Sequence, residues 1–151
     1  MRLSGISRGS KGTGVSLGAT EMGVVAVGGA VGTAARYAVA LAVPAWSGLP
    51  IATIVVNLLG AFLLGVLAEF LAARGPDDGP RRTLRLLVGT GVLGGFTTYS
   101  TFSLDTVTLI ETGRIAEAVV ATAGTLLLGV LAALLGIVVV SGGRAPLGEV
   151  E

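Results

Sequence analysis

The stretch GTGVLGGFTTYSTFSLD, from Gly89 to Asp105, decides how this chain can fold. It lies inside an apolar segment long enough to cross a membrane, yet hydroxyl side chains follow the pair Gly94 and Gly95 where a simple anchor would carry leucine. Glycine has no Cβ and tolerates unusual backbone angles, so we expect the helix to break at this pair. At bilayer depth a break persists only where protein or a water-filled cavity satisfies the freed backbone groups. The stretch therefore predicts an ion or substrate site at mid-membrane.

The composition of the chain is typical of a membrane protein. Of its 151 residues, 52% are hydrophobic and only 13% are charged, whereas about a quarter are charged in a typical soluble domain. The absence of Cys and His removes thiolate chemistry, disulfides, and the commonest metal ligand and general base. A net charge of +1, with basic residues scattered over loops, predicts no nucleic-acid binding. We therefore expect an integral membrane protein that is not an enzyme.

Four apolar segments follow one another, at Gly23 to Val43, Ile51 to Ala73, Leu86 to Ile110 and Ala118 to Val140. Each reaches the roughly 20 residues that a spanning helix needs. Their short connections predict one all-α domain of four transmembrane helices over residues 22–141, with the third helix broken. Small residues at helical spacing on these segments are typical of closely packed membrane helices.

Two tails are predicted to flank this domain. Residues 1–21 are basic, rich in Ser and Gly, and lack apolar periodicity, which predicts a disordered tail. Residues 142–151 form the predicted C-terminal tail. Met22 is an alternative start for the natural protein. A cleavable signal peptide is disfavoured because the first apolar run is too long and contains Arg36.

Several side chains inside the segments are candidates for an anion path. Arg36 lies past the middle of the first segment, where a buried charge suggests function; the alternative is that it reaches the interface. In either position its positive charge lies at one mouth of the protein, where it favours entry of an anion.

The side-chain amide of Asn57 could donate a hydrogen bond to an anion; the alternative is that it forms a hydrogen bond between two helices. Tyr99 and Phe102 are three residues apart among hydroxyls, and their positive ring edges suit an anion path. Glu69 and Asp105, near segment ends, are interpreted as ordinary solvated carboxylates.

Three runs of the sequence resemble one known family. GGFTTYSTFS, from Gly94 to Ser103, is similar to the third-helix signature of the Fluc fluoride channels, also called CrcB. GGAVGTAARY, from Gly28 to Tyr37, resembles their first-helix motif, and TIVVNLLGAFLLG, from Thr53 to Gly65, resembles their second-helix Asn motif. The resemblance covers residues 22–140. It departs from the family at Tyr99, where the family usually has Phe.

The resemblance implies four-helix subunits that pair as an antiparallel, dual-topology dimer, with two fluoride pores at the interface. It also implies a structural Na⁺, not transported, on the backbone carbonyls of Gly94 and Thr97; oxygen donors of this kind suit a hard cation. By motif match, Arg36 falls at the vestibule. A fluoride pore must replace the ion's water with close donors, and the residues assigned to it are Asn57, Thr98, Tyr99, Ser100, Thr101, Phe102 and Thr125.

The function predicted on this basis is passive export of fluoride across the cell membrane by a multi-pass channel, which lowers fluoride toxicity. The alternative is a small dual-topology multidrug or proton-coupled transporter. That class requires a buried carboxylate in its first helix, where this chain has Arg36. A membrane assembly subunit without transport activity would explain the small-residue stripes but not the run of hydroxyls and aromatics.

The distribution of basic residues bears on the dimer partner. Eight of the ten lie on the side of the termini and the second loop, Arg114 alone lies on the other side, and Arg36 is in the first helix. Under the positive-inside rule this bias fixes both termini in the cytoplasm, whereas a dual-topology subunit needs near balance. The dimer could therefore form with a second copy or with an oppositely biased paralogue. The Tyr99 hydroxyl also raises the alternative of an altered or silent pore.

Overall fold

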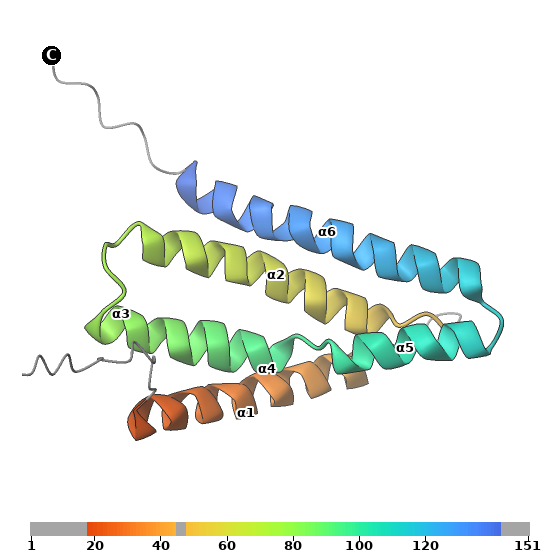
Figure 1. The fold of residues 1–151 in the computed structure, drawn as a ribbon, viewed down its shortest axis with the longest axis horizontal. Helices are drawn as coiled ribbons and strands as arrows, with labels where there is room; N and C mark the ends of the chain where they lie inside the picture. The colour runs from red at the N-terminus through yellow and green to blue at the C-terminus, as the bar shows by residue number, and fades with distance from the viewer. Residues whose placement is uncertain (1–17, 45–47, 143–151) are drawn as a thin grey trace, which may run out of the picture.

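The computed structural model describes residues 18–44 and 48–142, and the regular elements within these ranges are helices. They form four rods (Figure 1). The first, second and fourth rods are α1 (Ala19–Ala42), α2 (Ile51–Ala72) and α6 (Ile115–Ser141). The third rod comprises α3 (Gly79–Leu84), the π-helix η1 (Arg85–Leu93), α4 (Gly94–Phe96) and, after a break, α5 (Ser100–Glu111).

The four rods match the four predicted segments, with ends shifted by a few residues. α1 begins at Ala19 rather than Gly23, so residues 19–21, predicted as tail, are helical. Glu21 stabilises this start because its Oε2 accepts the Gly18 N–H at 3.0 Å, satisfying a donor that a helix N-terminus leaves free. The rest of the predicted tails, residues 1–17 and 143–151, lie outside the described residues. α1, α2 and α6 are each long and apolar enough to cross a membrane.

The rods lie side by side in the order α6, α2, third rod, α1 (Figure 1). They pack as two pairs, because the most extensive contacts join α2 to α6 and α1 to η1 and α4. Contacts between the pairs, such as those of α2 with η1 and of α1 with α2, are far fewer. The subunit is therefore two tight helix pairs joined more loosely along α2 and η1.

Glycines form the contact surfaces within each pair, as the small-residue stripes predict. A Cβ on Gly91 of η1 would lie 2.9 Å from the Cα of Gly28 on α1. In the other pair, a Cβ on Gly136 of α6 would collide with the backbone carbonyl of Phe62 on α2. Backbones in such close contact gain van der Waals packing where lipid supplies no hydrophobic force between helices.

The third rod is broken, but the break does not begin at the glycine pair. Gly94 has φ −64° and ψ −36°, an ordinary helical conformation, and Gly95 is also helical. The expected break at Gly94 and Gly95 was therefore wrong by two to three residues. Gly95 is needed instead for packing, since a Cβ there would collide with the backbone of Gly29. The chain leaves the helix at Thr97, with φ −73° and ψ 159°.

Adjacent glycines on α1 give a matched test of this packing. A Cβ on Gly28 would overlap the carbonyl of Leu87, whereas a Cβ on Gly29 meets nothing within 4 Å. We expect Gly28→Ala to destabilise the protein by about 1–3 kcal/mol, the usual cost of overpacking. Gly29→Ala should stay within about 0.5 kcal/mol of wild type. Thermal unfolding in detergent measures both, and equal midpoints would contradict the close approach of α1 and η1.

Candidate functional site

The break in the third rod leaves three residues, Thr97 to Tyr99, between α4 and α5. Thr97 makes the last helical contact, because its N–H and its Oγ1 both donate to the Leu93 carbonyl, at 3.0 and 2.9 Å. Its backbone then becomes extended. Thr98, the next residue, is buried and turns the chain into α5. The predicted break is therefore present in the middle of the third rod.

Asn57 of α2 holds the break in place. Its Nδ2 donates to the Thr98 carbonyl at 3.0 Å, and its Oδ1 accepts the Thr98 N–H at 2.8 Å. The side-chain amide thus pairs with the backbone groups that the break removes from the helix. The interhelical hydrogen bond weighed as the alternative for Asn57 is present. One Nδ2 hydrogen is left over, since an amide nitrogen carries two donors.

The Thr98 side chain organises the start of α5. Its Oγ1 accepts the Thr101 N–H at 3.2 Å, in the manner of an N-cap. The same hydroxyl donates to Thr101 Oγ1 at 3.0 Å and lies 3.3 Å from Ser100 Oγ. The Thr101 hydroxyl accepts this bond and keeps its own hydrogen for another partner. Three hydroxyls of the run, those of Thr98, Ser100 and Thr101, therefore form one connected cluster.

A groove of about 460 Å³ lies on one side of the break, and it brings together much of the predicted pore. The two aromatic rings line it together, with centroids 6.5 Å apart, and Tyr99 is 82% exposed. The Thr125 hydroxyl also lines the groove, but it donates to the Ala121 carbonyl at 2.6 Å, so its hydrogen is already used. The predicted residues in this groove are Asn57, Thr97, Thr98, Tyr99, Phe102 and Thr125.

A second groove, of about 380 Å³, contains the other residues predicted for the anion path, whereas Gly94, predicted for Na⁺, lines neither groove. Arg36 lines it with Ser100 and Thr101, and Thr98 is common to both grooves. Arg36 is half-buried, and within residues 18–44 and 48–142 no acidic side chain forms an ion pair with it. The structure thus divides the predicted site into an aromatic groove and a cationic groove that meet at Thr98.

Sequence reasoning missed two polar contacts near the site. Thr53 is buried on α2, and its Oγ1 donates to Asp105 Oδ2 at 2.7 Å. Asp105 is thus tied to another helix rather than simply solvated. The Oγ1 atoms of Thr106 and Thr122 lie 3.2 Å apart and link α5 to α6. The signal for the first contact was the i,i+4 spacing of Thr53 and Asn57, which places both on one face of α2.

The residues assigned to Na⁺ fit a site made of backbone oxygens. In a continuous helix the Thr98 N–H would bond to the Gly94 carbonyl, but here it donates to Asn57. The break therefore frees the Gly94 carbonyl, and Gly94 itself is exposed. Carbonyl oxygens are suitable ligands for a hard cation. The described part of the chain contains no group of three or more His, Cys, Asp or Glu that could hold a metal.

Comparison with known proteins places this arrangement in a family. The family model described as CrcB-like protein, Camphor Resistance (CrcB), matches residues 23–137, a range that includes the break and both grooves. The chain belongs to the CrcB family. With its long apolar helices, this CrcB protein is a multi-pass membrane protein.

Relatives of this CrcB protein bear the name fluoride-specific ion channel FluC. FluC 2 of Leifsonia xyli subsp. xyli is 49% identical over 123 residues, covering 82% of this chain and 85% of the relative. FluC of Caulobacter vibrioides is 42% identical over 121 residues, covering 77% and 91%. FluC of Paracoccus denitrificans is 46% identical over 116 residues, covering 76% and 90%. These names describe channels rather than enzymes, as the composition of the present chain predicts.

The hydrogen bonds of Asn57 generate a test of the break. Asn57→Asp keeps the acceptor for the Thr98 N–H but loses the donor to the Thr98 carbonyl. An unsatisfied buried carbonyl costs about 1–3 kcal/mol, so we expect a lower thermal midpoint and faster hydrogen exchange at residues 97–101. Thr108→Val is the control, because among the described residues the exposed Thr108 hydroxyl bonds only to the Leu104 carbonyl of its own helix. Unchanged exchange in Asn57→Asp would mean that Asn57 does not hold the break.

Proposed function

We propose that this CrcB protein is a fluoride-specific channel that exports fluoride passively from the cytoplasm. The observation that carries the proposal is the membership of the family, with relatives up to 49% identical that are named fluoride-specific ion channels. The geometry supports it, since the break gathers hydroxyl, amide and aromatic groups in grooves beside a lone arginine. Partial positive charges of this kind coordinate an anion without trapping it.

Passive export has a sufficient driving force. Hydrogen fluoride crosses a membrane as a neutral weak acid and dissociates inside, where the anion accumulates. A potential of about 100 mV, negative inside, favours expulsion of one negative charge by about 2.3 kcal/mol. A channel with no energy-coupling site is enough to use this force.

The donors nearest to the break are the best candidates to replace the water of fluoride. The second Nδ2 hydrogen of Asn57 and the Thr101 hydroxyl hydrogen are available in the described hydrogen-bond pattern. Ser100 would first have to give up its bond to Thr98, since the single hydrogen of the Thr98 hydroxyl goes to Thr101. Thr125 is a weaker candidate, because its hydroxyl would first have to leave the Ala121 carbonyl. Arg36 would then raise the local concentration of the anion at the mouth of the path.

The alternative, a proton-coupled or multidrug transporter, is less compatible with this structure. In the described part of α1 the acidic residue is Glu21, which lies in the first turn and pairs with Arg82 at 2.7 Å. A carboxylate in an end ion pair is not the mid-membrane proton carrier that such a transporter requires.

Fluoride efflux tests the proposed function directly. Liposomes containing the purified chain and loaded with potassium fluoride should release fluoride when valinomycin is added, as recorded by a fluoride electrode. Liposomes loaded with chloride should release far less chloride, because the path has to replace hydration at close range. Absence of fluoride release, both from this chain alone and from this chain with a paralogous subunit, would overturn the proposal.

We further propose an antiparallel dimer with a structural Na⁺ at its centre, held by the carbonyls of Gly94 and Thr97. Several features support it. Both grooves lie open on a single subunit, Tyr99 is 82% exposed, and Gly94 is exposed beside the freed carbonyl. A symmetric partner would double the number of carbonyl ligands at a central ion, as closed two-fold symmetry requires.

Gly94→Val tests the dimer and the ion together. Within one subunit, the nearest atom to a Cβ on Gly94 is the Gly89 carbonyl oxygen at 3.9 Å, so the fold itself accommodates the side chain. We expect loss of the dimer by light scattering, and loss of any stabilisation by Na⁺ relative to choline. Gly124→Val on α6 is the control, because a Cβ there meets nothing within 4 Å. An unchanged dimer and an unchanged Na⁺ effect would count against a central site.

The identity of the partner is a separate proposal. The α2–α3 connection and α3 lie at one end of the subunit, and the α5–α6 connection lies at the other (Figure 1). The first end holds Arg74, Arg81 and Arg82, with Arg85 directly after α3, and the second holds Arg114, which favours a single orientation and a paralogous partner. An introduced cysteine resolves the orientation, since the chain has none of its own. Ala73→Cys is suited to this, because Ala73 is exposed at the end of α2. Labelling from both membrane faces, with efflux from this chain alone, would establish a homodimer.

A further inference from the structure

We propose that the groove between α2 and η1 binds an anionic phospholipid, with one acyl chain along the groove and the phosphate on Arg81. The groove measures about 550 Å³, within the usual range for small-molecule sites. It is distinct from the two grooves at the break and shares no residue with them. The inference does not depend on fluoride conduction.

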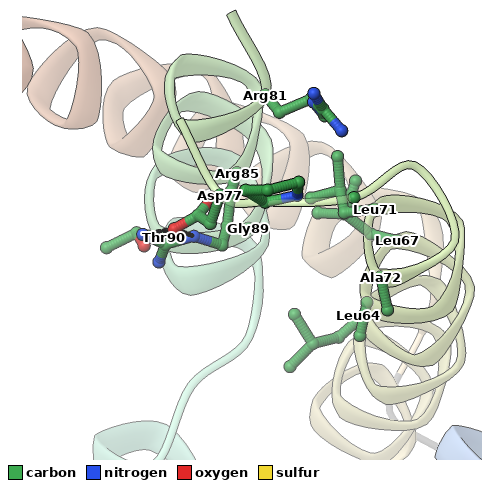
Figure 2. Close-up of a pocket in the computed structure, with 12 residues that line it drawn as sticks. Leu64, Leu67, Leu71, Ala72, Asp77, Arg81, Arg85, Gly89 and Thr90 are labelled. Carbon is green, nitrogen blue, oxygen red and sulfur yellow. Dashed lines mark hydrogen bonds and ion pairs between the residues drawn. The ribbon is translucent and has the colours of Figure 1, made fainter. Parts of the chain in front are cut away.

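The groove is apolar along its length and charged at its mouth. Figure 2 shows Leu64, Leu67 and Leu71 of α2 on one side and Gly89 and Thr90 of η1 on the other. It is open because α2 and η1 belong to different helix pairs and make few contacts with each other. The mouth is at the α2–α3 connection and is lined by Gly75, Pro76, Asp77, Arg81 and Arg85. This polarity matches that of a lipid, whose chain is apolar and whose headgroup is charged.

Three of the four arginines near the mouth already have partners. Arg85 binds Asp77 Oδ2 through Nε at 2.8 Å and Nη2 at 2.6 Å, and this hydrogen bond lowers the pKa of Asp77. Arg82 forms an ion pair with Glu21, and its Nη2 donates to Glu21 Oε2 at 3.2 Å; its Nε is buried without a hydrogen-bond partner in the part of the chain that the structure describes, but Arg82 does not line the groove. Arg74 stacks on the Phe70 ring at 3.3 Å and donates to the Phe70 carbonyl. These three guanidinium groups are largely used within the protein.

Arg81 is different, because its guanidinium has donors to spare. Its nearest carboxylate oxygen is Asp78 Oδ1 at 3.9 Å from Nη2, and Asp78 is 74% exposed. Its Nη1 is buried and finds no hydrogen-bond acceptor among the described residues. A buried N–H without a partner is costly, and a phosphate supplies several acceptor oxygens to a guanidinium. Basic pockets between transmembrane helices are known sites for anionic headgroups.

The test uses native mass spectrometry of the full chain, released from micelles containing equal amounts of phosphatidylglycerol and phosphatidylcholine. We expect the protein to retain phosphatidylglycerol preferentially. Arg81→Gln should lower the fraction carrying it several-fold. Arg74→Gln is the matched control, because it removes the same charge from the same connection but does not line the groove. Equal losses in the two variants, or no loss in Arg81→Gln, would overturn the proposal.

A second pair of variants tests the acyl chain. Ala72 lines the groove and Ala73 does not, although the two are adjacent and both are exposed. Ala72→Trp should fill the groove and reduce phosphatidylglycerol retention, whereas Ala73→Trp should leave it unchanged. If Ala72→Trp instead abolishes the dimer and leaves lipid retention intact, the groove is covered by a second copy of the chain and the lipid proposal is wrong.

Discussion

The pairing of the Asn57 amide with the Thr98 backbone is the interaction on which the rest of the site depends. A break inside an apolar rod leaves backbone N–H and C=O groups without helical partners, and at bilayer depth these need protein or a water-filled cavity to satisfy them. Asn57 satisfies the N–H and the carbonyl of Thr98 at once, at 2.8 and 3.0 Å. Because Thr98 is fixed in this way, its hydroxyl can cap α5 and orient Ser100 and Thr101. The position of the hydroxyl cluster therefore follows from one side chain on a neighbouring helix.

Glycine packing determines which helices pair closely. Gly28, Gly32 and Gly95 bring the backbones of α1 and the third rod into contact, and Gly65 and Gly136 do the same for α2 and α6. Each pair is tight because small residues allow close approach. Polar contacts between the two pairs include those of Asn57 with Thr98 and of Thr53 with Asp105. The loosely packed seam between them leaves the open groove between α2 and η1.

The fold was largely predictable from the sequence, because membrane-spanning length and small-residue spacing are local signals. The existence of the break was predictable too, since hydroxyls replace leucine after Gly95. Its position was not, because it depends on contacts from other helices: Gly29 requires Gly95 to remain in the helix, and Asn57 requires Thr98 to leave it. The same limit applies to Asp105, whose partner Thr53 is 52 residues away in the chain. Side-chain assignments to a pore, by contrast, remain predictions.

The double use of Asn57 constrains how an anion path could work in this protein. One of its two N–H donors is committed to the Thr98 carbonyl and its oxygen accepts the Thr98 N–H, so it could offer an ion only its remaining N–H. An ion at that position would be held by one amide donor and by hydroxyls that also bond one another. Such weak, shared coordination favours rapid release over tight binding, which is what conduction requires. Arg36 lies in the other groove, where its full charge can attract an anion without sharing the coordination at Asn57.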